Sequence, residues 1–221
     1  PVSARFPWDS RSTYLRRPPF VAPPRRADGI ERPTWIMARR QSNAKGRRGR
    51  TWLGGDGNLA ATLVYRPWCT PAQAAARSFM AANALLESLA LYIHRDCLAL
   101  KWPNDVLLNG GKLSGILLES IGSGGAIHAL VIGIGINLAA APDMDQVEPG
   151  ALRPVSLQGE TGLTVSPDDM LDALALAFDD WHRQMRDFGF APIRAAWLAR
   201  AARLGETITA RTGTAETTGR F

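Results

Sequence analysis

The sequence predicts a mixed α/β domain of the α+β type, in which helices back a central sheet. Short apolar runs rich in leucine and β-branched residues follow one another closely between residues 98 and 138, with turn residues between them. One long helical pattern precedes this group of runs, and another follows it. Because the runs are grouped and separated by turns, neighbouring strands are expected to pair through short connections.

We expect three parts: an irregular, proline- and arginine-rich segment over 1–33, a main domain over 34–204, and a short final segment over 205–221. The 221 residues, 46% of them hydrophobic, are enough to bury a core. Residues 1–50 carry 13 Lys and Arg against 3 Asp and Glu. This imbalance indicates an anionic partner, although a solvated basic face before Arg39 is an equally open interpretation.

A cytoplasmic protein without membrane association is expected. No apolar run approaches the roughly 20 residues needed to span a bilayer, and no signal-peptide pattern is present at the N-terminus. Cys69 and Cys97 lack the spacing of a metal or redox pair, which fits a reducing compartment or buried thiols.

Two strands are expected over 34–40 and 59–65. Between them, the segment from Gln41 to Arg50 combines two glycines with a cluster of basic residues. Such a composition suits phosphate binding by guanidinium groups and backbone amides. It contains no P-loop pattern, and a basic surface patch is the alternative interpretation.

Thr70 and Pro71 mark the start of a long helix, as N-cap and first helical residue. His94 is interpreted as the C-terminal cap of this helix. One apolar face is predicted for it, made of Ala75, Phe79, Ala82, Leu86, Leu89 and Ile93.

Three extended segments are predicted in the centre of the chain, with the sequences LALKW, LSGILL and ALVIGIGINL. Asp105 is interpreted as a turn-capping residue between the first two. Strand glycines often mark the close approach of a ligand or backbone, and here they are Gly115, Gly133 and Gly135. We interpret the region as a flat-walled pocket with a glycine floor, with Lys101 pointing in and Asn137 at the far end. Relief of crowding against a helix is the alternative role for the glycines.

Further elements follow this stretch. Residues 139–156 form a connection, and Ser166 starts a helix with Leu171, Leu174, Phe178 and Trp181 on one face. Another helix is expected over 192–203, and one or two strands over 207–221.

Four motifs in this order resemble the biotin protein ligase family, and the resemblance covers roughly residues 34–205. The motifs are GRRGRTW at 46–52, KWPND at 101–105, KLSGILLE at 112–119 and GIGIN at 133–137. The resemblance implies a class II aminoacyl-tRNA synthetase-like catalytic domain without an N-terminal DNA-binding domain. Residues 205–221 would then be the beginning of a small SH3-like barrel.

The resemblance also implies the reaction. ATP activates biotin to biotinyl-5'-adenylate with release of pyrophosphate. The biotinyl group is then transferred to a lysine of the biotin carboxyl carrier protein of acetyl-CoA carboxylase or a related carboxylase, which releases AMP. Mg²⁺ is expected with ATP, without identified protein ligands. The carrier is the expected partner, with no specific nucleic acid and with a homodimer as a further assembly.

Site residues are carried over from the family by motif position. Lys101 and Arg47 are implied as catalytic. The implied biotin contacts are Ser12, Thr13, Gln41, Lys45, Gly46, Arg47, Lys101, Gly115, Leu117, Gly133 and Gly135. The implied ATP contacts are Arg47, Arg48, Arg50, Trp52 and Asn137.

The family's Ser-Thr-Asn triplet is altered here to Ser12-Thr13-Tyr14. With the short 205–221 segment, this departure predicts weakened half-reactions, and transfer to the carrier is expected to suffer more than adenylation. A lipoate–protein ligase-like enzyme, a catalytically impaired biotin-binding remnant and a basic nucleic-acid-binding module remain open as alternatives.

Overall fold

A computed structural model describes residues 13–17, 33–39, 41, 44–67, 69–123, 125–212 and 215–221. A seven-stranded sheet forms its centre, in the order β1-β2-β3-β7-β6-β5-β4. The β1–β2 pair is parallel and the other pairs are antiparallel, so the predicted mixed sheet is confirmed. The strands are β1 (Thr13–Arg17), β2 (Thr34–Ala38), β3 (Leu59–Tyr65), β4 (Leu98–Lys101), β5 (Asp105–Leu108), β6 (Gly111–Ser123) and β7 (Ala126–Ile136).

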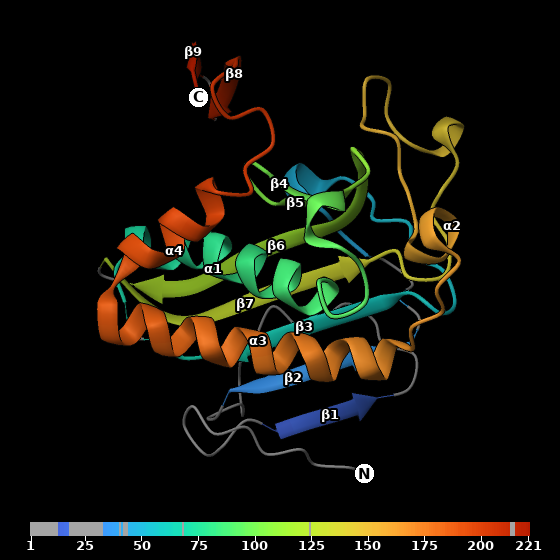
Figure 1. Cartoon of the computed structure of the whole chain (residues 1–221). Coiled ribbons are helices and arrows are strands. Elements are labelled where there is room, and N and C mark those ends of the chain that lie inside the picture. The colour runs from blue at the N-terminus through green and yellow to red at the C-terminus, as the bar shows by residue number, and fades with distance from the viewer. Residues whose placement is uncertain are drawn as a thin grey trace.

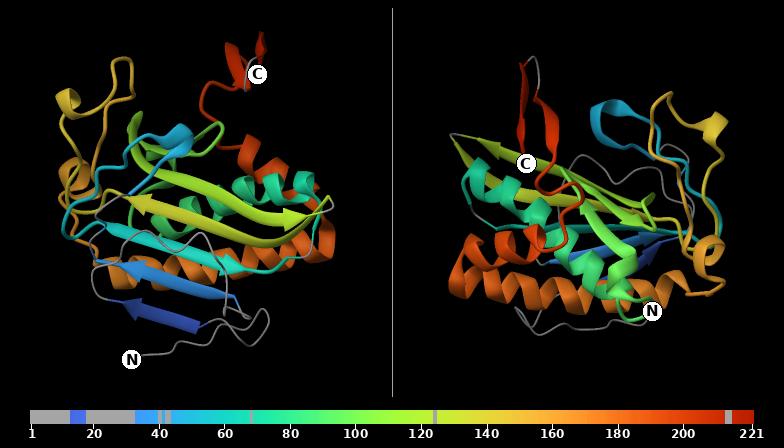
Figure 2. Two further views of the ribbon diagram at one scale, coloured as in Figure 1. Left: turned by 180° about the vertical axis from the view of Figure 1, so that it is seen from behind. Right: turned by 45° about the horizontal axis from the view of Figure 1, so that its top comes forward.

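Helices cover one face of this sheet (Figure 1). The long helices α1 (Pro71–Leu89) and α3 (Pro167–Phe188) pack side by side, and α4 (Phe190–Leu198) contacts both. Figure 2, left, shows the opposite face of the sheet, which α1, α3 and α4 leave uncovered. The shorter helices are η1 (Arg47–Gly49), η2 (Arg95–Cys97), η3 (Met144–Gln146) and α2 (Leu157–Thr161).

The pleat of the strands separates core from pocket. Successive side chains of a strand point to opposite faces, so alternate residues of β6 and β7 meet the helices. Ile116, Ile134 and Leu63 are buried on this side. The ring of Phe178 on α3 packs edge-to-face against Trp35 on β2, with ring centroids 5.8 Å apart.

The start of α1 forms as predicted, but its buried face differs. Thr70 Oγ1 accepts a hydrogen bond from the Gln73 backbone N–H, and the Gln73 side chain accepts one from the Thr70 N–H. Ala75 is exposed, whereas the stretch from Met80 to Leu86 is buried on nearly all sides. The single-face prediction was therefore wrong, because the second half of α1 lies between the sheet and two other helices.

The end of α1 also differs from the prediction. The helix ends at Leu89, so His94 lies beyond it and does not cap it. His94 instead precedes η2, where its Nδ1 accepts a hydrogen bond from the Asp96 N–H.

Two strands were not predicted. Thr13–Arg17 lies in the segment expected to be irregular, yet it forms β1 through hydrogen bonds to β2. No strand was predicted between the first two extended segments, where Asp105 was interpreted as a turn-capping residue, yet Asp105–Leu108 forms β5 between β4 and β6. Both strands are four or five residues long, so pairing with a neighbour decides their conformation more than their own sequence.

The remaining chain follows the prediction with shifted bounds. The last helix spans Phe190–Leu198 instead of 192–203. Within 207–221, β8 (Thr207–Thr212) pairs antiparallel with β9 (Ala215–Arg220), and the two strands stand away from the sheet in Figure 1. The ring of Phe221 lies 6.0 Å from that of Trp197 on α4. Among the described residues, no helix has the length and apolar character to cross a membrane.

Candidate active site

The face of the sheet opposite α1 and α3 carries a large open cavity of about 1120 Å³. Its floor follows from the strand register, because residues directly opposite one another in neighbouring strands share a face. We call one row of such residues the Lys101 row. From β4 to β2 it runs Lys101, Asp105, Gly115, Gly135, Ala60 and Ala38.

The Lys101 row places charge at one end and small residues along the rest. The next row on the same face pairs Leu117 with Gly133 and then Thr62. A pocket with a flat floor and a charged end results, as the sequence predicted. A planar apolar group with an anionic end matches this shape.

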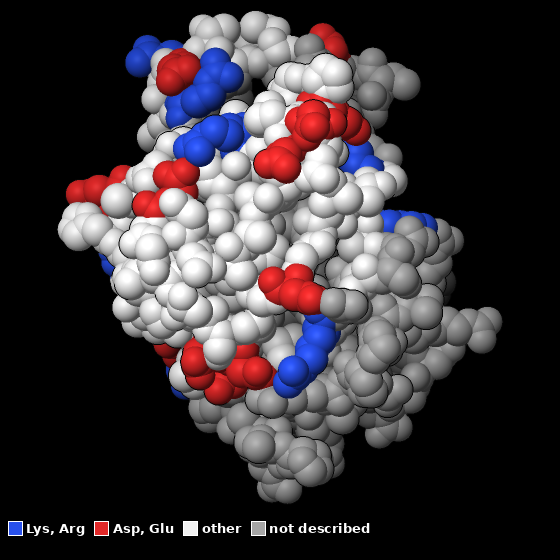
Figure 3. All heavy atoms as spheres, turned by 90° about the vertical axis from the view of Figure 1, so that its right-hand side faces the viewer, with Lys and Arg blue, Asp and Glu red and all other residues white. Residues whose placement is uncertain are grey.

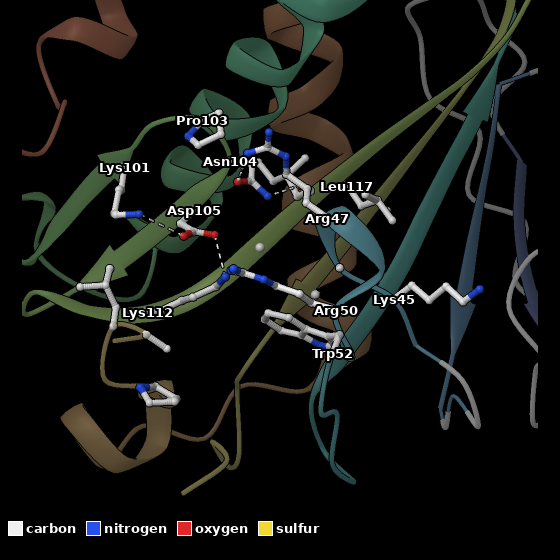
Figure 4. Close-up of a pocket in the computed structure, with 18 of the residues that line it drawn as sticks. Lys45, Arg47, Arg50, Trp52, Lys101, Pro103, Asn104, Asp105, Lys112 and Leu117 are labelled. Atoms are coloured by element: carbon white, nitrogen blue, oxygen red, sulfur yellow. Dashed lines mark hydrogen bonds and ion pairs between the residues drawn. The ribbon is translucent and has the colours of Figure 1, made fainter. Parts of the chain in front are cut away.

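Three charged side chains meet at the charged end (Figure 4). The Asp105 carboxylate lies 2.8 Å from Lys112 Nζ and 3.7 Å from Lys101 Nζ. The side chain of Asp105 is 12% exposed, against 38% for Lys101 and 32% for Lys112. The turn-capping interpretation of Asp105 was therefore wrong, because its carboxylate pairs with two lysines.

Lys112 reaches the pocket through a β-bulge. Its position three residues before Gly115 would place it on the core face of a regular strand. The register shifts by one residue opposite Val106 and Leu107, and this shift returns Lys112 to the pocket face. Lys112 Cε consequently lies 3.7 Å from where a Cβ on Gly115 would be. A bulge leaves little signal in a single sequence, and the Lys112 contribution was missed.

The basic loop forms an ordered wall of the cavity. The Gly46 N–H donates to the Arg50 carbonyl at 2.7 Å, and the Trp52 N–H donates to the Ala44 carbonyl at 3.0 Å. Between them lies η1, whose last residue, Gly49, has a φ of 75°, a left-handed conformation that glycine adopts at little cost.

Two arginines of this wall have partners elsewhere in the site. Arg47 Nη1 donates to Asn104 Oδ1 at 3.3 Å, and Asn104 is itself held to Ile116 on β6 by two hydrogen bonds. Arg50 forms a 2.9 Å ion pair with Glu148 in the 139–156 connection. Both ion-pair partners are more than half exposed, so an incoming anion can compete for Arg50.

Trp52 lies on the glycine floor. A Cβ built on Gly135 would come within 2.6 Å of the indole, and one built on Gly115 within 3.2 Å. Lys112 Nζ lies 5.6 Å from the indole centroid, within the range of a cation–π contact. The close approach inferred at these two glycines is thus to Trp52 in this structure. A Cβ on Gly133 would meet only Leu117 atoms at 3.7 Å.

Asn137 closes the far end of the pocket. Its Nδ2 donates to the Val155 carbonyl at 3.1 Å, while its Oδ1 has no hydrogen-bond partner among the described residues. The residue is only 3% exposed. A buried amide oxygen without a partner is costly, so it suits a ligand that donates a hydrogen bond there.

Glu160 of α2 supports the floor from outside. Its carboxylate accepts a 2.9 Å hydrogen bond from Asn109 in the β5–β6 turn and forms a 2.9 Å ion pair with Arg153. The hydrogen bond from Asn109, followed by the one from Arg153, lowers the pKa of Glu160 below its ordinary value. We call the interactions of Glu160 with Asn109 and Arg153 the α2 clip. The Arg153 carbonyl in turn accepts a hydrogen bond from the Lys112 N–H at 2.8 Å, so the α2 clip is linked to the strand that carries Lys112.

Most of the predicted site residues line this one cavity: Gln41, Lys45, Gly46, Arg47, Arg50, Trp52, Lys101, Gly115, Leu117, Gly133, Gly135 and Asn137. Lys45 points away from the Lys101–Asp105–Lys112 group in Figure 4. Ser12 lies outside the described residues, as do the side chains of Thr13 and Arg48.

The face drawn in Figure 3 carries basic and acidic side chains in small neighbouring groups. Among its described residues, no continuous basic surface of the kind that follows a nucleic-acid backbone is visible.

Comparison with known proteins finds relatives that are ligases of one family. A family model described as the biotin/lipoate A/B protein ligase family matches residues 23–137. A biotin–[acetyl-CoA-carboxylase] ligase of Paracoccus denitrificans is 58% identical over 196 residues, covering 88% of this chain and 82% of that protein. The bifunctional ligase/repressor BirA of Bacillus subtilis is 30% identical over 184 residues. The match covers 81% of this chain, which spans about half (55%) of the length of that relative.

Solved structures agree on the fold. The biotin protein ligase from Aquifex aeolicus in complex with biotin and ATP superposes with a TM-score of 0.73 at 22% identity, over 95% of this chain and 85% of that chain. The biotin protein ligase from Leishmania major in complex with biotin gives a TM-score of 0.68 at 22% identity, over 91% and 85%. The class II aminoacyl-tRNA synthetase-like fold is thereby confirmed.

Proposed function

Because this chain belongs to the biotin/lipoate A/B protein ligase family, we propose that it is a biotin protein ligase. It activates biotin with ATP and transfers the biotinyl group to a lysine of a biotin carboxyl carrier protein. The observation that carries this proposal is the Lys101 row, in which a flat floor of small residues ends at a cation. The 58% identity to a biotin–[acetyl-CoA-carboxylase] ligase favours biotin over lipoate as the substrate.

The reaction has two steps. A biotin carboxylate oxygen attacks the α-phosphorus of ATP, forming the acyl-phosphate bond as the bond to pyrophosphate breaks. The amine of the carrier lysine then attacks the biotinyl carbonyl carbon, AMP leaves with the bond electrons, and the amine loses a proton. Both steps concentrate negative charge at the acyl-phosphate, where a positioned cation in a confined site stabilises the transition state.

Lys101 is the residue we assign to that charge. Its ammonium group faces the pocket at the end of the small-residue floor. Arg47 shares this catalytic role from the opposite wall, where Asn104 orients its guanidinium group.

The nucleotide is assigned to the basic loop and the far end of the pocket. Arg47, Arg48 and Arg50 contact the phosphates, and Trp52 stacks on adenine. The unpartnered Oδ1 of Asn137 supports a hydrogen bond from the adenine amino group, since that oxygen can only accept. Mg²⁺ accompanies ATP as part of the substrate, and the described residues hold no group of three carboxylate, His or Cys ligands for it.

Biotin is assigned to the rows around Leu117 and Gly133. The bicyclic ring lies against the glycine strands, and its ureido group pairs with Gln41, Ser12 and Thr13. Lys45 and Gly46 complete the wall over it. A cytoplasmic location fits the use of ATP and the two free cysteines.

Isotope exchange between pyrophosphate and ATP tests the first step. We expect biotin-dependent exchange by the purified chain, with little exchange when lipoate replaces biotin. Lys101→Ala should reduce the exchange by about 100- to 1,000-fold, as removal of one charge-stabilising group typically does. Its thermal unfolding curve should stay close to that of the wild type, because the Lys101 side chain is more than a third exposed. Near-normal exchange in Lys101→Ala would contradict the assignment of this residue.

A further inference from the structure

We propose that Asn58 is a positioning residue for the nucleotide, although it lies outside the cavity. Its side chain holds the backbone of Ala139 and Ala140, and this attachment keeps Asn137 in place at the far end of the pocket. Asn58 lies in the turn that precedes β3, and it is not among the residues that line the cavity. The inference rests on the proposed function, because Asn137 is there assigned to adenine.

One buried amide satisfies backbone groups of a segment that is distant in sequence. Asn58 Oδ1 accepts hydrogen bonds from the Ala139 N–H at 2.9 Å and from the Ala140 N–H at 3.1 Å. Its Nδ2 donates to the Ala140 carbonyl at 2.8 Å. We call these hydrogen bonds the Asn58 anchor. Because Asn58 is only 8% exposed, a side chain that cannot both donate and accept would leave these backbone groups without partners.

The turn that carries Asn58 is itself ordered and packs closely on the same segment. The Asn58 N–H donates to the Gly55 carbonyl at 3.2 Å. Gly57 has a φ of 82°, and a Cβ built on it would lie 2.8 Å from Ala139 Cβ. The turn and the segment are therefore in direct contact at two consecutive residues of the turn, and this close approach requires the glycine at position 57.

The anchored segment begins two residues after Asn137, at the start of the 139–156 connection. The Asn137 side chain donates to the Val155 carbonyl, which belongs to the other end of this connection. Both ends of the connection therefore meet at Asn137. The later end is held by backbone hydrogen bonds to Lys112 on β6. Asn58 provides the corresponding attachment for the earlier end.

Loss of the Asn58 anchor should act on one end of the pocket. Without it, the segment from residue 139 onward can move relative to β7, and Asn137 loses the support that directs its amide. Glu148 lies on the same connection, so its ion pair with Arg50 should weaken as well. The floor around Leu117 is fixed by the hydrogen bonds that pair β6 with β7. The anchor should therefore affect the nucleotide and leave biotin binding unchanged.

Asn58→Leu removes the whole anchor and keeps the approximate size of the side chain. We expect the KM for ATP to rise about tenfold, the effect of one or two lost buried hydrogen bonds, and biotinyl-adenylate to leave the enzyme faster. Biotin affinity should stay close to that of the wild type. Asn58→Asp keeps an acceptor for the N–H groups of Ala139 and Ala140, so it should recover part of the ATP affinity.

Gly57 provides an independent perturbation of the same contact. Gly57→Ala should also raise the KM for ATP, because the new methyl group would push against Ala139. The double variant Gly57→Ala/Ala139→Gly removes this overlap, and its KM should return toward the wild-type value. Gly110→Ala is the matched control, since Gly110 has a φ of 78° and open space around its Cβ position. It introduces similar backbone strain without the overlap.

Asn83→Leu is the control for an amide with a purely structural role. Asn83 is 3% exposed, and its Nδ2 donates to the Ile193 carbonyl at 3.0 Å, which links α1 to α4. This variant should lower the midpoint of thermal unfolding without changing the ratio of ATP affinity to biotin affinity. If Asn58 were purely structural, Asn58→Leu would give the same pattern of lost stability and an unchanged ratio.

The test is a steady-state measurement of adenylate formation at varied MgATP, with the affinities for biotin and MgATP measured by calorimetry on the same samples. A selective loss of MgATP affinity in Asn58→Leu and Gly57→Ala, reversed in part by Asn58→Asp and by the double variant, supports the proposal. Wild-type MgATP affinity in Asn58→Leu overturns it, as does an equal loss of affinity for both ligands. If Asn58→Leu does not fold, Asn58→Asp and Gly57→Ala decide by the same criterion. A wild-type chain that forms no adenylate would instead refute the proposed function, while the MgATP affinities would still test the anchor.

Discussion

At the scale of single residues, the missing side chains of two glycines decide what lies on the pocket floor. The indole of Trp52 occupies the space over Gly135 and part of that over Gly115. A base bound by stacking on Trp52 would therefore lie one layer above the sheet. The floor at Gly133 stays open for a second planar group.

Gly135→Ala should destabilise the protein by about 1–3 kcal/mol, because the new methyl group would overlap the indole and force it off the floor. Gly133→Ala is the matched control, since its Cβ would meet only ordinary contacts at 3.7 Å and glycine is itself unfavourable within a strand. Denaturant unfolding of both variants checks this, together with the indole N–H resonance of Trp52. Equal stabilities of the two variants would contradict the packing account.

Substitution of the arginines in the basic loop should lower the affinity for ATP more than the affinity for biotin. Arg47→Ala and Arg50→Ala each remove charge-assisted hydrogen bonds, so we expect ATP affinity to fall by about 10- to 100-fold. Biotin affinity should change little, because the proposed function assigns the biotin ring to the rows around Leu117 and Gly133 and its ureido group to Gln41, and assigns the phosphates to these two arginines. Calorimetric titration with each ligand measures the difference, with Arg186→Ala on α3 as a control for surface charge. Lost biotin affinity with unchanged ATP affinity would reverse the assignment.

At the scale of elements, the sequence predicts those with strong local signals. The N-cap at Thr70, the strand of residues 59–65 and the N-cap at Ser166 all form as predicted. Strands that form only through pairing with neighbouring strands were not predicted. β1 and β5 are short, and their conformation depends on hydrogen bonds to β2, β4 and β6.

The same distinction holds for the site. Lys101 and the strand glycines stood out, because each is an unusual residue for a strand. Lys112 did not stand out, since only a one-residue register shift brings it to the pocket face. Asp105 was misjudged because the sequence does not show that two lysines flank its carboxylate.

The α2 clip gives a prediction at this scale. Interactions that depress the pKa of a carboxyl group stabilise the folded protein when the pH is above the pKa of that group in the unfolded state. This stabilisation is lost as the pH falls through the lower pKa of the group in the folded state. Glu160→Gln should therefore lower the midpoint of thermal unfolding at neutral pH. The difference from wild type should shrink as the pH falls below the ordinary value of 4.5. Asn109→Ala, which removes the main hydrogen-bond donor to Glu160, should reduce the same pH dependence. A difference that grows on acidification would contradict the clip.

At the scale of the whole molecule, the two faces of the sheet separate the apolar core from the pocket. Helices α1 and α3 bury the apolar side of the sheet, and the opposite side carries the cavity, so substitutions in the Lys101 row need not disturb the core. The 139–156 connection and the basic loop close the cavity from two sides, joined by the Arg50–Glu148 ion pair. Both walls lie far apart in sequence, and their pairing could not be predicted from either segment.

The most direct test of the central claim follows one biotin through both steps on one preparation. The purified chain is incubated with biotin, MgATP and a biotin carboxyl carrier domain, and mass spectrometry measures biotinyl-adenylate and modified carrier. We predict that adenylate forms first and that a single carrier lysine then gains the biotinyl group, with both products lost in Lys101→Ala. If wild type and Lys101→Ala yielded the same amounts of both products, or if wild type yielded neither, the assignment of this pocket as a biotin ligase active site would be wrong.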